Sequence, residues 1–289
     1  SYRSYTDYHT DGIIMIGTLY MLYGYLRAVG NTFYDFASMY GDIMKYDARI
    51  QGAYRIDDAF DEIRSKVGGG IPYNWKEIEL KGVEFAYDSD VKKYNLKDVD
   101  IKFKRGEKIA LVGESGSGKS TILSLIRGLY YLDKGDVNVD NIKISNGVER
   151  LKRHVTLIPQ DPEIFNNTLK YNITMNLRTK KEDLKKAIKM AQFEDVVKRL
   201  EKGLDTNVLE KGVSLSGGEK QRLALVRGLL AAKRSDIVLL DEPTSSVDSM
   251  NEMKIHDNIF REFKDKTIIS SIHRLHLLDK FDYIYMFDK

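Results

Sequence analysis

The sequence predicts an α/β fold in which helices cover both faces of a mostly parallel sheet, with a long helix preceding it. After residue 77, short apolar segments alternate with segments of helical periodicity, which is typical of a parallel sheet. Before residue 68, apolar residues recur three and four positions apart, as on one face of a helix. Gly68, Gly69, Gly70 and Pro72 separate the two patterns, so we expect a domain boundary there.

The N-terminal pattern predicts an amphipathic helix that continues from Arg27 to Val67. It follows Gly12–Leu26, an uncharged run of 15 residues, whereas a helix that crosses a membrane alone needs roughly 20. Eleven of the 18 tyrosines precede residue 76, and tyrosine is frequent at interfaces and at membrane–water boundaries. A buried or interfacial helix and the remnant of a membrane helix both fit these observations.

The remaining elements are predicted from their own patterns, in chain order. Alternating or continuous apolar residues predict strands at 78–87, 96–103, 108–112, 154–158, 236–240, 267–272 and 282–287. Helical periodicity predicts helices at 119–130, 181–201 and 217–233. Strands that alternate with helices in this way are expected to form a mostly parallel sheet that helices cover on both faces.

Composition excludes several functional classes. Lys and Arg number 46 and Asp and Glu 43, a net charge of +3, so the chain has no basic field and no nucleic-acid partner is expected. The absence of cysteine excludes disulfides, thiolate zinc sites and a cysteine nucleophile. An apolar content of 42% and a charged content of 31% are typical of a globular chain rather than a disordered one.

The segment from Gly113 to Ser120 has the G-x4-G-K-[ST] pattern of a phosphate-binding loop, between a predicted strand and a predicted helix. Its glycines let backbone N–H groups point at phosphate oxygens, and the helix N-terminus adds its positive end. Lys119 would reach the β- and γ-phosphates, and the Ser120 hydroxyl suits a Mg²⁺ ligand. A Gly/Ser-rich turn is the alternative, and the strand–helix context argues against it.

A second motif is the apolar run Ile237–Leu240 followed by Asp241 and Glu242. It predicts a buried strand whose terminal carboxylate emerges at the nucleotide edge of the sheet, where Asp241 would hold Mg²⁺. Glu242 would polarise an attacking water as a general base. Alone, the run also fits an ordinary strand end, and its pairing with the phosphate loop favours the chemical interpretation.

A third motif lies at the start of the predicted helix 217–233. Ser216 and Glu219 form a capping-box pattern, but two consecutive glycines, Gly217 and Gly218, lower helix propensity. They are explained if bare backbone N–H groups approach an anion. Two anion-facing helix starts about 100 residues apart are hard to reconcile with one phosphate group in one chain.

From about Ile78 to the C-terminus, these motifs resemble the nucleotide-binding domain of an ATP-binding-cassette (ABC) transporter. The phosphate loop is similar to Walker A, Ile237–Asp241 to Walker B, and Leu215–Gln221 to the LSGGQ-type signature. The resemblance implies a P-loop NTPase fold of the ABC type, with a mostly parallel core sheet, an antiparallel β-subdomain and an α-helical signature subdomain. It implies three parts: the end of a transmembrane domain at 1–70, a linker at 71–76 and a C-terminally truncated nucleotide-binding domain at 77–289.

The resemblance also implies the site residues. Catalytic roles fall to Lys119, Gln160, Glu242 and His273, and Mg²⁺ would be bound by Ser120, Gln160 and Asp241. Tyr87 would stack on adenine, and Asp248 closes the D-loop (Ser245–Asp248). Residues expected to contact ATP are Tyr87, Gly113, Glu114, Ser115, Gly116, Ser117, Gly118, Lys119, Ser120, Thr121, Ser216, Gly217, Gly218 and Asp248.

The resemblance implies an exporter subtype. Phe165–Ile173 is similar to the segment after the Q-loop of exporter domains, and Asp205–Gly212 to their X-loop, with Glu210 as its acidic residue. The implied partners are a second ABC cassette, identical or different, and a transmembrane domain, with the ATPase on the cytoplasmic face of the membrane. Because one helix cannot form a transport pathway, the chain is expected to be a fragment or to act with a separate membrane polypeptide.

The expected function is therefore the binding and hydrolysis of ATP to drive export, with two cassettes enclosing the nucleotides. A soluble ABC-type ATPase and a regulatory, non-hydrolysing cassette are the alternatives. The first usually carries a coiled-coil insertion or a tandem cassette, and neither is visible in the sequence. The second would normally lack Glu242, His273 or a signature glycine, and all are present.

Overall fold

The computed structural model describes residues 17–46, 70–87, 94–145, 147–161, 163–208 and 214–288. The chain divides into two compact units, Ser1–Lys66 and Val67–Lys289. We call the second unit the cassette. The expected division at 1–70, 71–76 and 77–289 stays a prediction.

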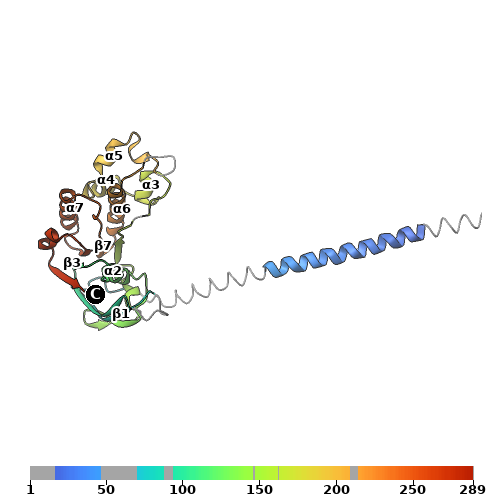
Figure 1. The fold of residues 1–289 in the computed structure, drawn as a ribbon, viewed down its shortest axis with the longest axis horizontal. Coiled ribbons are helices and arrows are strands. Elements are labelled where there is room, and N and C mark those ends of the chain that lie inside the picture. Colours follow the sequence, from blue (N-terminus) through green and yellow to red (C-terminus); the bar gives the residue numbers. More distant parts are fainter. Residues whose placement is uncertain are drawn as a thin grey trace, which may run out of the picture. The chain divides into compact units, whose positions relative to one another are not determined.

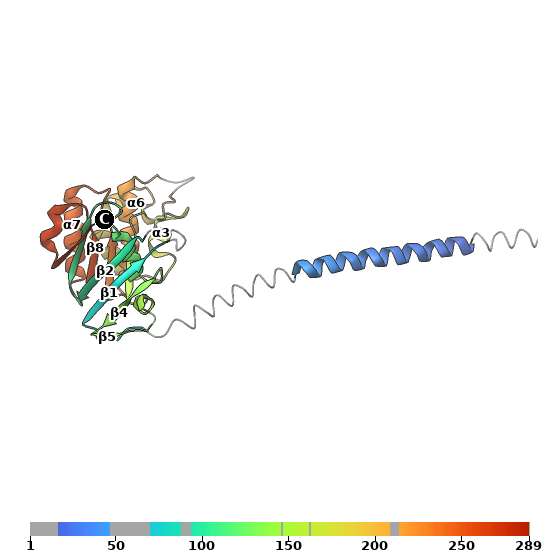
Figure 2. The same ribbon diagram turned by 60° about the horizontal axis from the view of Figure 1, so that its bottom comes forward.

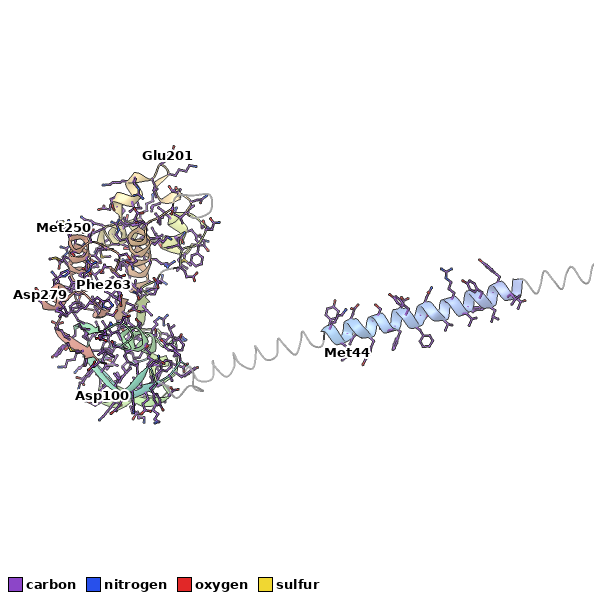
Figure 3. The ribbon with its side chains drawn as sticks, in the orientation of Figure 1. Met44, Asp100, Glu201, Met250, Phe263 and Asp279 are labelled. Atoms are coloured by element: carbon purple, nitrogen blue, oxygen red, sulfur yellow. The ribbon has the colours of Figure 1, made fainter. Side chains whose placement is uncertain are left out.

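The N-terminal unit contains a helix at residues 17–46, drawn in blue in Figure 1. Its large apolar side chains are exposed along its length, and Figure 3 shows them projecting from the helix, with Met44 labelled. In the part of the chain that the structure covers, no helix combines the length and the apolar character that crossing a bilayer requires. The predicted continuation to Val67 and the first residues of the uncharged run lie outside the described ranges.

The cassette contains two sheets. Five parallel strands form the first, in the order β6-β7-β8-β3-β9: β3 (Lys108–Gly113), β6 (Val155–Ile158), β7 (Ile237–Asp241), β8 (Thr267–Ser271) and β9 (Tyr283–Phe287). Four antiparallel strands form the second, in the order β2-β1-β4-β5: β1 (Glu77–Phe85), β2 (Leu96–Lys104), β4 (Lys134–Val139) and β5 (Ile142–Lys143). Figure 2 shows the antiparallel strands together.

Five helices in the described part of the cassette fall into two groups. The first is α2 (Lys119–Ile126), which follows β3. The second group gathers at the end of the cassette away from β1 in Figure 1: α3 (Leu169–Thr174), α4 (Lys181–Met190), α5 (Glu194–Arg199) and α6 (Gly217–Ala232). Helix α7 (Ser249–Glu262) and three short 3-10 turns complete the cassette: η1 (Gly147–Leu151), η2 (Gly203–Asp205) and η3 (Leu275–Lys280).

The parallel sheet separates two hydrophobic cores because alternate side chains of a strand point to opposite faces. On β7, Val238 and Leu240 pack with helices α3 to α7. Ile237 and Leu239 pack with α2 and the antiparallel strands. The predicted fold class, a parallel core sheet with an antiparallel subdomain and a helical subdomain, is confirmed.

Two predicted helices differ from those observed. The helix expected at 181–201 is interrupted between α4 and α5, where Gln192 has φ = 51°. The helix expected at 119–130 ends at Ile126, and Gly128 follows with φ = 72°. In both cases a residue with left-handed backbone geometry cannot continue a right-handed helix.

Candidate functional site

The loop between β3 and α2 is a tight curl that only glycine permits at two positions. Gly118 has φ = 99° and caps α2, and a Cβ there would lie 2.5 Å from Leu96 Cδ2. A Cβ on Gly113 would collide with the carbonyl oxygen of Phe287 on β9. The intervening residues Glu114–Ser117 form the turn, and the Ser117 hydroxyl is buried with no hydrogen-bond partner in the described residues. The curl brings the N-terminus of α2 to the end of β3, as the sequence predicts.

Lys119 and Ser120 lie in the first turn of α2 and face this curl. The Lys119 ammonium donates hydrogen bonds to the carbonyl oxygens of Gly113 and Glu114, each at 2.8 Å. Because Lys119 is buried, its charge needs polar partners, and these carbonyl oxygens supply them. The Ser120 hydroxyl donates to Asp241 Oδ1 at 3.0 Å. The phosphate loop and the end of β7 are therefore directly joined.

Asp241 ends β7, a strand buried at every position. Its Oδ1 atom accepts hydrogen bonds from Ser120 and from Ser271, the latter at 2.8 Å. Ser271 ends β8 and also accepts the backbone N–H of Glu242 at 3.0 Å. The carboxyl ends of parallel strands meet at one sheet edge, and β3, β7 and β8 bring these groups together there.

Glu242 is held between two side chains from other segments. Its Oε2 atom accepts a hydrogen bond from Gln160 Nε2 at 2.9 Å, and its Oε1 atom lies 2.5 Å from His273 Nε2. Because an ionised carboxylate only accepts, the His273 nitrogen is the donor. Glu242 has φ = 44°, a backbone geometry uncommon outside glycine. Gln160, Glu242 and His273, which follow β6, β7 and β8 respectively, thus form one hydrogen-bonded group. All three are among the site residues expected from the sequence.

Tyr87 lies beside this region after β1. Its hydroxyl donates to Thr121 Oγ1 of α2 at 3.3 Å. Its ring packs edge-on against Phe85 and Tyr130, with centroid distances of 5.0 and 5.1 Å. The Tyr87 side chain remains 52% exposed, so it is accessible to a ligand. The sequence does not predict the contribution of Tyr130, because nothing in its local pattern indicates contact with Tyr87.

The start of α6 has the predicted capping box. Ser216 Oγ accepts the N–H of Glu219, whose side chain accepts the N–H of Ser216 at 2.9 Å. Burial alone would raise the pKa of Glu219, but hydrogen bonds from Arg199 and Ser216 outweigh it and lower that pKa. Helix geometry leaves the N–H groups of Gly217 and Gly218 without an acceptor inside the helix. They remain available to an anion.

A cavity of about 260 Å³ lies at this helix start, lined by Ser216, Gly218, Glu219, Arg222, Ser246, Val247 and Asp248. Asp248 caps α7, and hydrogen bonds from the backbone and side chain of Asn251 lower the pKa of Asp248. None of the residues that line the cavity belongs to the phosphate loop. The structure therefore brings the phosphate loop, Asp241, Glu242, Gln160 and His273 together, and gathers Ser216, Gly218 and Asp248 elsewhere.

Two further residues in these groups were given no role in the sequence prediction. The Ser271 hydroxyl donates to Asp241 and accepts the backbone N–H of Glu242. A serine at the end of a predicted strand does not by itself indicate these contacts. Gln221, inside the third motif, bonds to the loop after β7. The expected X-loop residue Glu210 lies outside the described residues.

Comparison with known proteins identifies the family. Residues 96–245, more than half of the chain, match the family model described as ABC transporter. The chain belongs to the ABC transporter family and carries its ATP-binding domain. This result confirms the family resemblance seen in the sequence.

The relatives are exporters and transporters. The chain is 38% identical to the ATP-dependent lipid A-core flippase of Pectobacterium atrosepticum over 211 residues, which are 72% of this chain and 36% of the flippase. It is 33% identical to ABC transporter B family member 15 of Arabidopsis thaliana over 285 residues, 96% of this chain and 23% of the relative. The structure of a bacterial Atm1-family ABC exporter with ATP bound matches with a TM-score of 0.68 at 32% identity, covering 82% of this chain and 42% of the exporter. The chain thus spans less than half the length of each.

Proposed function

We propose that this chain is the ATP-hydrolysing part of an ABC exporter, and that two cassettes enclose ATP between them. The observation that carries the proposal is the hydrogen-bonded group of Gln160, Glu242 and His273 at the sheet edge that also bears the phosphate loop. A carboxylate oriented by two donors beside a phosphate site is arranged to act on a water that attacks a phosphoryl group. The exporter relatives support the same activity.

The residues at this edge fit a Mg²⁺ ion. Mg²⁺ prefers oxygen ligands and is usually held by one or two carboxylates together with substrate phosphates and water. Ser120 and Asp241 supply a hydroxyl and a carboxylate that are 3.0 Å apart, and Gln160 would add an amide oxygen. No group of three or more His, Cys, Asp or Glu side chains in the described ranges could hold a metal ion. Bound there, Mg²⁺ would neutralise phosphate charge.

The chain's own residues then divide the work. Lys119, whose ammonium is already held at the loop by two carbonyls, would exchange them for phosphate oxygens. Backbone N–H groups of the curl would bind the same phosphates. Glu242 would take the water proton at its carboxylate, with Gln160 fixing one oxygen and His273 donating to the other. Tyr87, accessible beside α2, would stack on the adenine.

A second cassette would complete each site. The cavity at the start of α6 is lined by Gly218, whose N–H has no acceptor inside the helix, and by Ser216 with its hydroxyl, and both groups suit a phosphate. Its lining residues are separate from those of the phosphate loop in the same chain. Two copies packed head to tail would place the α6 start of one against the nucleotide of the other.

The membrane part of the proposal rests on the N-terminal unit. We infer that residues 1–70 belong to the end of a transmembrane domain and that the cassette lies on the cytoplasmic face. The alignment with the Arabidopsis transporter supports this, because it covers 96% of this chain and so includes most of Ser1–Lys66. The exposed apolar side chains of the helix at 17–46 are also consistent with further partners.

The test is the substitution Glu242→Gln in the full chain. It keeps the shape and the hydrogen bond to Gln160 but removes the proton acceptor, so ATP hydrolysis should fall by at least about 100-fold. ATP binding should persist, measured by fluorescence titration with a labelled nucleotide. The matched control is Glu201→Gln, on an exposed turn after α5 that Figure 3 labels at the far end of the helical group. Unchanged phosphate release in the Glu242→Gln chain would refute the assignment, and no hydrolysis by the parent chain would favour a regulatory cassette.

A further inference from the structure

The first turn of α6 is packed tightly against the D-loop of the same chain. A Cβ on Gly218 would lie 2.5 Å from the carbonyl oxygen of Ser246, so this position must be glycine for the two segments to touch. The sequence explains Gly218 by an approaching anion, and the structure adds this second reason. Gln221 is three positions further along, on the same helix face. The α6 start and the D-loop are therefore in direct contact.

Gln221 fixes this contact with both ends of its amide. Its Nε2 atom donates to the Ser245 hydroxyl at 2.7 Å, and its Oε1 atom accepts the N–H of Ser246 at 2.9 Å. The side chain is only 8% exposed. A carboxylate could accept but not donate here, and an apolar side chain could do neither. The amide is thus matched to the D-loop in type and in orientation.

The same amide also reaches the segment that holds the catalytic glutamate. Gln221 Nε2 lies 3.4 Å from the backbone carbonyl oxygen of Gln160, at the outer limit of a hydrogen bond. The Gln160 side chain donates to Glu242 Oε2. A continuous path of contacts thus joins the α6 start, through Gln221 and Gln160, to Glu242.

We propose that Gln221 is a positioning residue that couples the two nucleotide sites of the dimer. The proposal rests on the proposed function, in which the α6 start binds the nucleotide held by the partner while Glu242 acts on the nucleotide of its own chain. A displacement of the α6 start reaches the Gln160 backbone through Gln221, and it changes how Gln160 orients the Glu242 carboxylate. Gln221 touches no nucleotide, so its effect appears in turnover and cooperativity rather than in ATP affinity.

The experiment compares the parent chain with Gln221→Met, which keeps the length and removes the hydrogen bonds. We expect kcat to fall by about tenfold, the effect of one or two lost neutral hydrogen bonds. KM for ATP should stay within about twofold, and the Hill coefficient should drop toward 1. The control is Thr156→Val on β6, which removes the 2.6 Å hydrogen bond between Thr156 and Ser235 and touches neither Gln221 nor Glu242. It should change stability without changing cooperativity.

A double-mutant cycle with Gln160→Ala tests the path itself. If Gln221 acts through Gln160, the double variant should have nearly the kcat of Gln160→Ala alone, since the second change removes a link already cut. Additive effects on kcat, or an unchanged Hill coefficient in Gln221→Met, would overturn the coupling while leaving the dimeric ATPase intact. A parent chain that hydrolyses ATP with a Hill coefficient of 1 would refute the shared site, and the coupling with it.

Discussion

Asp241 and His256 are both buried polar side chains, but their surroundings are opposite. Asp241 has two hydroxyl donors at the edge where the nucleotide is expected. His256 is fully buried in α7, and neither ring nitrogen has a hydrogen-bond partner among the described residues. Its ring packs edge-on with Phe260 and Phe281. Asp241, whose oxygen has hydrogen-bond donors, belongs to the candidate site. His256, whose ring nitrogens have none, destabilises the hydrophobic core around it.

His256 makes the stability of the cassette dependent on pH. Burial lowers the pKa of His256 from 6.5 to about 4, and the nearby charges of Asp257, Lys280 and His276 modify this only secondarily. Between these two values the unfolded chain binds a proton that the folded chain does not. The free energy of unfolding therefore falls as pH decreases through this window, by about 2 kcal/mol between pH 7 and pH 5.

The substitution His256→Leu should remove that dependence. Leucine has a similar volume and no polar atom. Between pH 7 and pH 5, the free energy of unfolding of the variant should therefore fall by about 2 kcal/mol less than that of the parent chain. Urea denaturation measures the difference, followed by the fluorescence of Trp75, the single tryptophan of the chain and fully buried in the cassette. Parallel pH slopes in parent and variant would contradict the account.

At the scale of elements, apolar periodicity predicts a strand or a helix correctly when the residues on its buried face are apolar. It misses α7, because the buried face of this helix includes Glu252 and His256 beside Ile255 and Ile259. It misses β4, whose sequence KGDVNV contains polar residues and a glycine. It predicts one helix where Gln192 separates α4 from α5, since a left-handed residue leaves no mark on periodicity.

The candidate site was predictable where a motif has its own spacing, as in Gly113–Ser120. The hydrogen bonds of Gln160 to Glu242 and to Gln221 were not, because each joins segments more than 60 residues apart. Only the tertiary fold brings such groups together. The same limit applies to Asp236, just before β7, which accepts from Arg105 at 3.0 Å and lies 2.9 Å from His154 Nδ1.

Asp236 should therefore matter for the attachment of segment 70–75 to the sheet. Its Oδ2 atom also lies 3.4 Å from Trp75 Nε1, so Asp236→Asn weakens several interactions at once. We expect it to lower the free energy of unfolding by about 1–3 kcal/mol. The control is Asp136→Asn, which breaks the exposed pair with Lys143 and should change stability by less than about 0.5 kcal/mol. If urea denaturation showed equal losses of unfolding free energy in Asp236→Asn and Asp136→Asn, the Asp236 contacts would contribute no more to stability than an exposed ion pair.

At the scale of the whole molecule, the cassette has two proposed phosphate sites that share no residue. One is the curl before α2, and the other is the cavity at the start of α6. A second copy that brings the missing half of each pocket would explain this separation. The coupling through Gln221 and the role of Ser216 depend on that assembly.

The most direct test is the mass of the Glu242→Gln chain with ATP and Mg²⁺, measured by sedimentation velocity in a mild detergent. We predict that the mass doubles when ATP is added. Adding Ser216→Arg should abolish the doubling while ATP still binds, because the arginine fills the cavity at α6. A Glu242→Gln chain that is saturated with ATP and keeps the mass of a single copy would contradict the shared site.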